Sequence, residues 1–244
     1  MEIKTKVITL YAREKGEADK LVTFFSLDQG VISATVKGVR KAGAKLSSCT
    51  FSFAFSEVVL AEKSGFYTVT ACDTIEPFFE ITNNFEIFEY ASACLELTQN
   101  LLHGNIETQT VFILLLQTLK NMCYEHGEPK TIFLNYLFDM ISIAGYKINL
   151  TLANKLVQEK GHCYINLESG QIISAYSLDM NVAKIDKDIL ILLQDLSNVS
   201  SSDLEMLSTK YKQNKVIDLT FAWAKVLCEN LMGYKFKSFL TIDL

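Results

Sequence analysis

Residues 7–36 read VITLYAREKGEADKLVTFFSLDQGVISATV. Three runs rich in apolar, β-branched and aromatic residues lie in or overlap this stretch, at 4–11, 21–26 and 31–36. Gly16 and Gly30 mark turns between them. Short runs of this composition, separated by turn residues, predict β-strands. We therefore expect three consecutive strands at the start of the chain.

Two further runs of the same kind follow at 51–61 and 66–72, with turn signals at Gly43 and Gly65. Five short strands in about 75 residues suit a small closed or partly open barrel, because closure removes the unpaired edges of an isolated sheet. The first domain is therefore predicted to be a five-stranded β-barrel over residues 1–80.

After Pro77 the apolar period changes from two to about 3.6 residues, which predicts helices. Helices are expected over 85–102, 108–124, 129–144, 187–196 and 216–232, and near Ser202 and Glu205, which have capping-box spacing. Between them, 146–182 is less regular, and 163–166 and 171–173 read as a small hairpin. The predicted class is α+β, with a helical domain over 81–244 that contains this hairpin segment.

The charge of the chain is unevenly distributed. Residues 1–50 hold nine basic and five acidic residues, a net charge of +4, whereas the other 194 residues hold 14 basic and 23 acidic, a net charge of −9. A basic module on an acidic body indicates a local polyanion site.

Composition also excludes several classes. About half of the residues are hydrophobic and only two are proline, which argues against disorder. The longest apolar run, 111–116, is far shorter than the roughly 20 residues of a membrane span. The basic start lacks the apolar segment of a signal peptide, so we expect a cytoplasmic protein with no membrane partner. Six cysteines without a C-x-x-C pair are expected to be small buried hydrophobes.

Motifs of catalysis are missing from the sequence. It contains neither a G-x-x-x-x-G-K-[ST] loop nor G-x-G-x-x-G nor G-x-S-x-G. Glu14, Glu17 and Asp19 alternate with basic residues, which favours a solvated turn over a magnesium site. His162 next to Cys163 lacks a second pair at ligand spacing. We therefore expect no enzyme activity, no catalytic residue, no metal and no cofactor.

The most distinctive constellation is a basic loop, which we define as residues 37–45. It carries four cations, no acid and two glycines that let the backbone approach a ligand. Such a loop tracks phosphates, while Tyr11 or Phe24 stacks on bases. The predicted DNA-binding residues are Lys37, Arg40, Lys41 and Lys45, with weaker contributions from Arg13, Lys15 and Lys20, which have acidic neighbours.

The order of these residues resembles the RecO family. The resemblance rests on Val7 to Leu10, the run GEADKLVT at 16–23, KGVRK at 37–41, and the later segments GFYTVT at 65–70 and KFKS at 235–238. It implies an OB-fold followed by a helical domain. It also implies binding of single- and double-stranded DNA, strand annealing, and work with RecR and single-stranded DNA-binding protein to load RecA. A DNA repair and recombination mediator, associated with the nucleoid, is the expected function.

One departure from the family concerns zinc. Many RecO proteins carry two cysteine pairs that hold a structural zinc ion. Here Ser174 and Ser177 stand where the second pair is expected, and 149–156 has no cysteine. The hairpin segment is therefore predicted to be a degenerate zinc finger held by packing.

Two other functions remain open from the residues. The first makes the barrel an interaction module whose basic loop binds an acidic partner tail, in which case DNA competes with the partner only where their sites overlap. A metal-dependent nuclease requires clustered acids near the basic face, and a cleavage assay with Mg²⁺ tests it.

Overall fold

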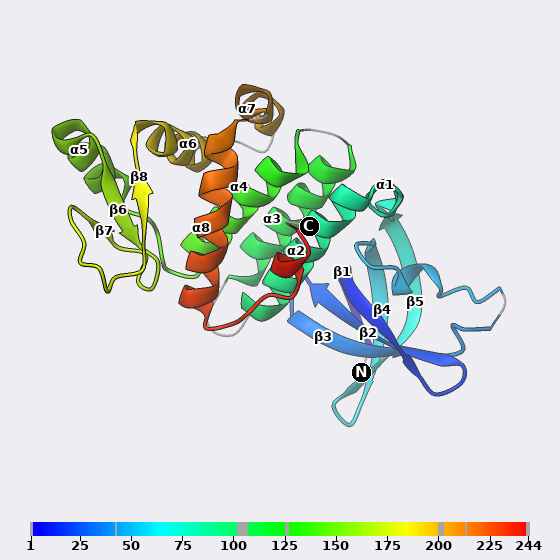
Figure 1. Ribbon diagram of the computed structural model, residues 1–244. Helices are drawn as coiled ribbons and strands as arrows, with labels where there is room; N and C mark the ends of the chain where they lie inside the picture. The colour runs from blue at the N-terminus through cyan, green and yellow to red at the C-terminus, as the bar shows by residue number, and fades with distance from the viewer. Residues whose placement is uncertain are drawn as a thin grey trace. The chain divides into compact units, whose positions relative to one another are not determined.

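The computed structural model describes residues 2–41, 43–101, 107–124, 127–199, 203–212 and 214–242. The chain divides into two compact units, residues 1–123 and 124–244. Figure 1 shows a β-barrel in the first and helices with a small sheet in the second. The mixed α+β class is as predicted.

Five strands form a closed barrel in the order β1-β2-β3-β5-β4. Strand β1 pairs antiparallel with both β2 and β4, whereas β3 and β5 close the barrel through two parallel pairs, Ala34 with Tyr67 and Thr35 with Thr68. The predicted five-stranded barrel is confirmed, with these bounds: β1 Glu2–Lys15, β2 Asp19–Ser26, β3 Gly30–Val36, β4 Phe55–Lys63 and β5 Phe66–Glu76.

The alternation of β-strands explains the barrel core. Val22 and Phe24 on β2 and Val58 and Leu60 on β4 point to the same interior and are fully buried. Phe25 faces the other way but is also buried, because its ring packs against Phe112 with ring centres 5.5 Å apart. One set of alternating residues thus fills the barrel, and Phe25 from the other set contacts a helix.

The α-helices described in the first unit are α1 Phe79–Asn83, α2 Phe85–Leu101 and α3 Thr108–Cys123. Helices α2 and α3 lie where they were predicted, whereas α1 was not predicted. The strand expected over 51–61 begins only at Phe55. The preceding residues form the short helix η1 (Ser48–Thr50) and a turn in which Phe53 has a φ of 74°, a backbone conformation incompatible with an extended strand.

The second unit is built around α4 (Pro129–Ile143), whose predicted inward residues Ile132, Phe133, Tyr136, Leu137, Met140 and Ile141 are all buried. It packs against α6, α7 and α8. Ser202 lies outside the described residues. The remaining elements are α5 Leu150–Lys160, β6 Cys163–Asn166, β7 Ile172–Ile173, β8 Val182–Ile185, α6 Lys187–Asn198, α7 Leu204–Tyr211, α8 Lys215–Met232 and η2 Ser238–Leu240.

The hairpin segment contains more structure than predicted. Strand β6 pairs with β7 as expected, but also with β8, in the order β7-β6-β8. Helix α5 precedes them, capped by the Asn149 side chain, which accepts a hydrogen bond from the Leu152 N–H at 3.0 Å. The ring of Tyr164 contacts those of His162 and Tyr176, with centres 5.3 and 4.7 Å away. Aromatic packing therefore supports the small sheet.

Within the described ranges, no helix is both long and apolar enough to cross a membrane. The same residues contain no cluster of three or more histidine, cysteine or acidic side chains suited to a metal ion.

Candidate nucleic-acid interface

The basic loop is held against the turn between β1 and β2. The Gly38 N–H donates a hydrogen bond to the Asp19 carboxylate at 2.8 Å. The Arg40 guanidinium forms an ion pair with Glu14 at 3.1 Å and donates a hydrogen bond to the Gly16 carbonyl, also at 3.1 Å. The acidic residues of this turn thus anchor the loop, which supports the prediction of a mixed-charge turn over a magnesium site.

A hollow of about 520 Å³, here called the basic hollow, opens between this loop and β5. Among the described residues, Lys37, Lys41 and Lys45 form no ion pair and are exposed. Their charges are therefore available to a ligand, unlike that of Arg40. The lining residues are Lys37, Gly38, Ala44 and Lys45 from the loop, Leu46 directly after it, and Thr70, Ala71 and Cys72 from β5.

The three weaker candidates do not line the basic hollow. The Lys15 ammonium donates to the Thr35 hydroxyl at 2.8 Å, and the Lys20 ammonium to the Thr50 hydroxyl at 3.5 Å. Arg13 is exposed on β1. The structure therefore does not bring these three residues into the basic hollow.

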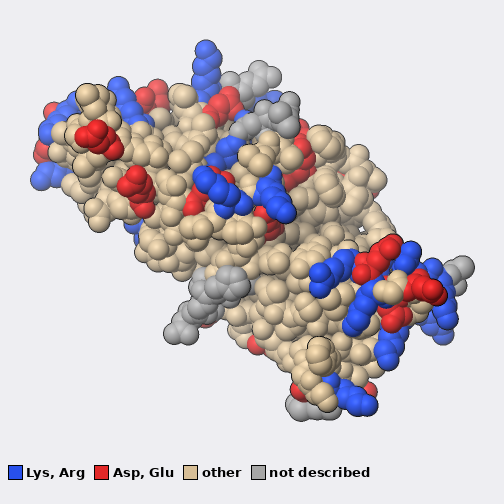
Figure 2. Space-filling view, turned by 60° about the horizontal axis from the view of Figure 1, so that its bottom comes forward, with Lys and Arg blue, Asp and Glu red and all other residues tan. Residues whose placement is uncertain are grey.

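Charge is polarised over the first unit. Figure 2 shows blue Lys and Arg side chains gathered with red acidic ones at one end of the barrel, and mainly uncharged surface over the rest of its visible face. Residues 64–119 contain seven acidic residues and no Lys or Arg. The basic residues of the first unit therefore lie outside this acidic segment.

The structure corrects one predicted base-stacking residue. Phe24 is fully buried in the barrel core, so its ring is inaccessible to a base. Tyr11 is 41% exposed, but it lines a different hollow, of about 270 Å³, together with Phe53 and Phe88. Phe51 and Phe66 are 50% and 77% exposed and were not singled out from the sequence. Their only sequence signal is an aromatic residue beside a turn.

Cys72 was also missed. Five of the six cysteines are buried as predicted, whereas Cys72 is only partly buried and lines the basic hollow. Cys72 lines the hollow with Lys37 and Lys45 because β5 pairs with other strands of the barrel, and no local sequence pattern reveals that pairing.

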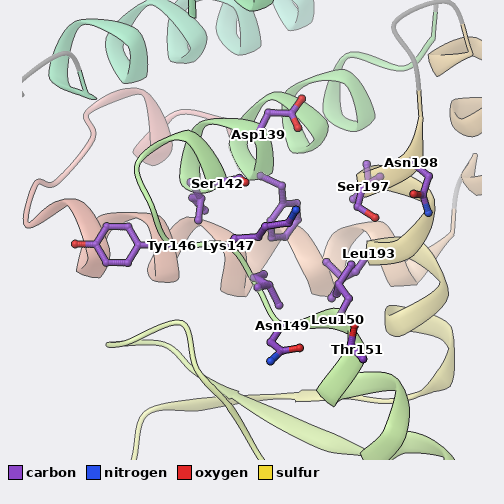
Figure 3. Close-up of a pocket in the computed structure, with 14 residues that line it drawn as sticks. Asp139, Ser142, Tyr146, Lys147, Asn149, Leu150, Thr151, Leu193, Ser197 and Asn198 are labelled. Atoms are coloured by element: carbon purple, nitrogen blue, oxygen red, sulfur yellow. The ribbon is translucent and has the colours of Figure 1, made fainter. Parts of the chain in front are cut away.

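The second unit contains another hollow, of about 670 Å³, shown in Figure 3. Residues from α4, the connection to α5, α5 and α6 surround it, among them Tyr146, Lys147, Asn149 and Leu193. Burial raises the pKa of Asp139, which also lines it, to about 6. Its mixed apolar and polar lining suits a ligand with both characters.

Comparison with known families identifies the chain. The models of the recombination protein O N terminal and C terminal regions match residues 1–78 and 83–210. The chain belongs to the RecO family. The fold described above is consistent with the OB-fold and helical domain expected of RecO proteins, and the two matched regions meet near residue 80. The domain boundary itself stays a prediction, since the compact units divide at residue 123.

Among RecO relatives, the DNA repair protein RecO of Acetivibrio thermocellus is 31% identical over 144 residues, which cover 59% of this chain and 57% of the relative. That of Alkaliphilus metalliredigens is 27% identical over 207 residues, or 82% and 84% of the two chains. That of Dehalococcoides mccartyi is 29% identical over 169 residues, or 69% and 63%. The chain thus spans less than two thirds of the first and third of these relatives.

Proposed function

We propose that this chain is a DNA repair and recombination mediator that binds single- and double-stranded DNA through the basic loop. The observation that carries the proposal is the basic hollow, where Lys37 and Lys45 line a surface beside a β-strand and form no ion pair with any residue that the structure describes. Membership of RecO and the DNA repair names of its relatives support the same role.

The mechanism follows from the chemistry of the loop. Lysine ammonium groups neutralise phosphates and release counterions, which supplies affinity without reading sequence. Gly38 has a φ of 66°, and a Cβ atom added there would meet no atom within 4 Å, so the need for glycine is conformational. The loop therefore presents backbone and cations to a strand while Asp19 and Glu14 hold its shape.

We further propose that the chain anneals complementary strands and works with RecR and single-stranded DNA-binding protein to load RecA. Charge neutralisation supports annealing, because two strands approach each other more readily when their phosphates are screened. Loading requires no bond-breaking step, so the proposal includes no nucleotide hydrolysis, cofactor or catalytic residue. Association with the nucleoid follows from DNA binding.

The test is annealing of complementary oligonucleotides coated with single-stranded DNA-binding protein, with and without this chain. Faster annealing that depends on Lys37, Lys41 and Lys45 supports the proposal. A chain that binds neither DNA nor the coated strands, but does bind an acidic peptide through the same lysines, would instead support the interaction module. Strand cleavage with Mg²⁺ would support the nuclease.

A further inference from the structure

Several phenylalanine side chains of the first unit are exposed where α1 and α2 begin. Phe79 and Phe85, the first residues of these two helices, are 57% and 76% exposed. Phe88, one turn further along α2, is also exposed, and so is Phe51, whose ring centre lies 6.4 Å from that of Phe79. Large apolar side chains that gather on the surface of a soluble chain mark an interaction site, whereas scattered ones need no explanation. We call these four residues the aromatic face.

A hollow of about 270 Å³ belongs to the aromatic face. Phe88 and Phe53 both line it and pack edge to face, with ring centres 5.7 Å apart. Phe51 precedes Phe53 by two residues, so the turn that lines the hollow also carries the ring that contacts Phe79. The volume is below the roughly 300–1,000 Å³ of sites for small molecules. It therefore suits one apolar side chain of a larger partner.

The charge around the aromatic face is negative. Residues 64–119 contain seven acidic residues and no Lys or Arg. Glu80 lies in α1, and Glu86 and Glu89 lie in α2 next to the exposed rings. None of these three forms an ion pair with a residue in the described part of the chain. Carboxylates beside apolar rings attract a cationic partner.

The same charges disfavour other occupants. Nucleic acid and anionic lipid are both polyanions, which an acidic surface repels. A second copy of this chain, docked through the same face, would bring like charges together, because a two-fold interface pairs a patch with itself. A partner that carries both apolar and basic side chains meets neither objection.

We propose that the aromatic face binds a cationic amphipathic segment of a partner protein. One apolar side chain of the segment enters the hollow beside Phe88, and its lysine or arginine residues lie against Glu86 and Glu89. Cations also bind the faces of exposed aromatic rings, which adds to the attraction. An amphipathic helix that places apolar side chains in a groove is a common way for one protein to recognise another. The inference does not depend on DNA binding, since none of the four rings lines the basic hollow.

The probe is a fluorescein-labelled synthetic peptide of about 18 residues, long enough to form a helix, with leucine at helical spacing and lysine elsewhere. Fluorescence anisotropy measures its binding to the full chain. Phe85→Ala should weaken binding about tenfold, the usual effect of truncating an aromatic anchor. Replacing Glu86 and Glu89 together by glutamine should weaken it about fivefold and reduce its dependence on salt. A peptide of the same composition in scrambled order should bind about tenfold more weakly, because its leucines no longer share one face.

Phe66→Ala is the matched control. Phe66 is as exposed as Phe85 but lies at the opposite end of β5 from α1, roughly 30 Å away at the rise of an extended strand (Figure 1). This variant should bind the peptide as wild type does. Circular dichroism verifies folding, and the glutamine variant changes only exposed or partly exposed carboxylates, so it tests the face even where Phe85→Ala fails to fold.

The outcomes separate the possible occupants. No binding of the peptide, or equal binding by wild type and both aromatic-face variants, would overturn the proposal. An equal loss in Phe66→Ala would overturn the placement on this face. Two further measurements are sedimentation of the chain alone and its binding to phosphatidylcholine vesicles. A dimer or vesicle binding that Phe85→Ala abolishes, without peptide binding, would assign the face to a second copy or to lipid and overturn the protein partner.

Discussion

Replacing Lys37, Lys41 and Lys45 together by alanine tests the basic loop most directly. These three lysines are exposed and form no ion pair within the described residues, whereas Arg40 is already bound to Glu14 and Gly16. Each phosphate contact contributes about −0.7 to the log-log salt slope of single-strand binding. The triple variant should therefore bind with a slope about 2 units shallower than wild type.

That change in slope has a measurable size. Between about 50 and about 200 mM salt, a difference of about 2 in slope means that wild type loses roughly 20-fold more affinity than the variant. The assay is fluorescence anisotropy of a labelled oligothymidylate titrated at several salt concentrations. Because phosphate contacts do not read bases, an unrelated mixed sequence should show the same change.

A matched variant controls for loss of charge alone. Lys155, Lys160 and Lys187 are exposed in the second unit and form no ion pair among the residues described there, and their replacement by alanine should leave the slope unchanged. Circular dichroism verifies that both variants fold. An unaltered slope in a folded basic-loop variant, or an equal change in the control, would refute the placement of the DNA site on this loop.

Asp139→Asn should raise the free energy of unfolding at pH 7 by about 1–3 kcal/mol. Burial raises the pKa of Asp139 to about 6, so its ionisation destabilises the fold as pH rises from about 4 to 6. Urea unfolding that shows the same effect of the variant at pH 4 and pH 7 would contradict this. Tyr211→Phe removes a 2.6 Å hydrogen bond to Asp195 and should cost about 1.5 kcal/mol by the same assay, where an unchanged midpoint argues otherwise. Arg40→Ala should cost only about 0.5 kcal/mol, since its ion pair is partly exposed to solvent, and a loss of several kcal/mol would mean that the loop is integral to the barrel. Elemental analysis should find no stoichiometric zinc, and about one zinc ion per chain would show that other ligands replace the missing cysteines.

The barrel was predictable because its strands carry a local signal. Apolar runs ending near Gly16 and Gly30 mark strand and turn regardless of what they pack against. The short helix η1 was not predictable, since Phe53 resembles a strand residue and its turn depends on hydrogen bonds with Thr9 on β1. Helix α5 was also not predicted. Only Ala153, Leu156 and Val157 of its residues are buried, so the helix has little of the apolar period by which helices are recognised.

For the candidate site too, local sequence signals were readable, whereas contacts between distant residues were not. The basic loop was visible as a cluster of cations in consecutive sequence, whereas the bond between Arg40 and Glu14 joins distant positions. The choice of Phe24 for base stacking was wrong because residues 22–26 are all buried, so this apolar run does not show which face of β2 a ligand reaches.

The position of β1 between β2 and β4 leaves part of this strand unpaired while the chain is being synthesised. Strand β1 can pair with β2 soon after both are synthesised, but its other edge has no partner until β4, which ends at Lys63, has been made. At about 5–20 residues per second, residues 27–63 take roughly 2–7 s to be made, and an unpaired strand edge invites association with other chains during that time. The part of β1 that pairs with β4 carries Glu2, Lys4 and Lys6, which are all exposed in the folded chain. Charges on such an edge oppose wrong pairing, so these side chains protect the nascent barrel before Lys4 finds its partner Glu57.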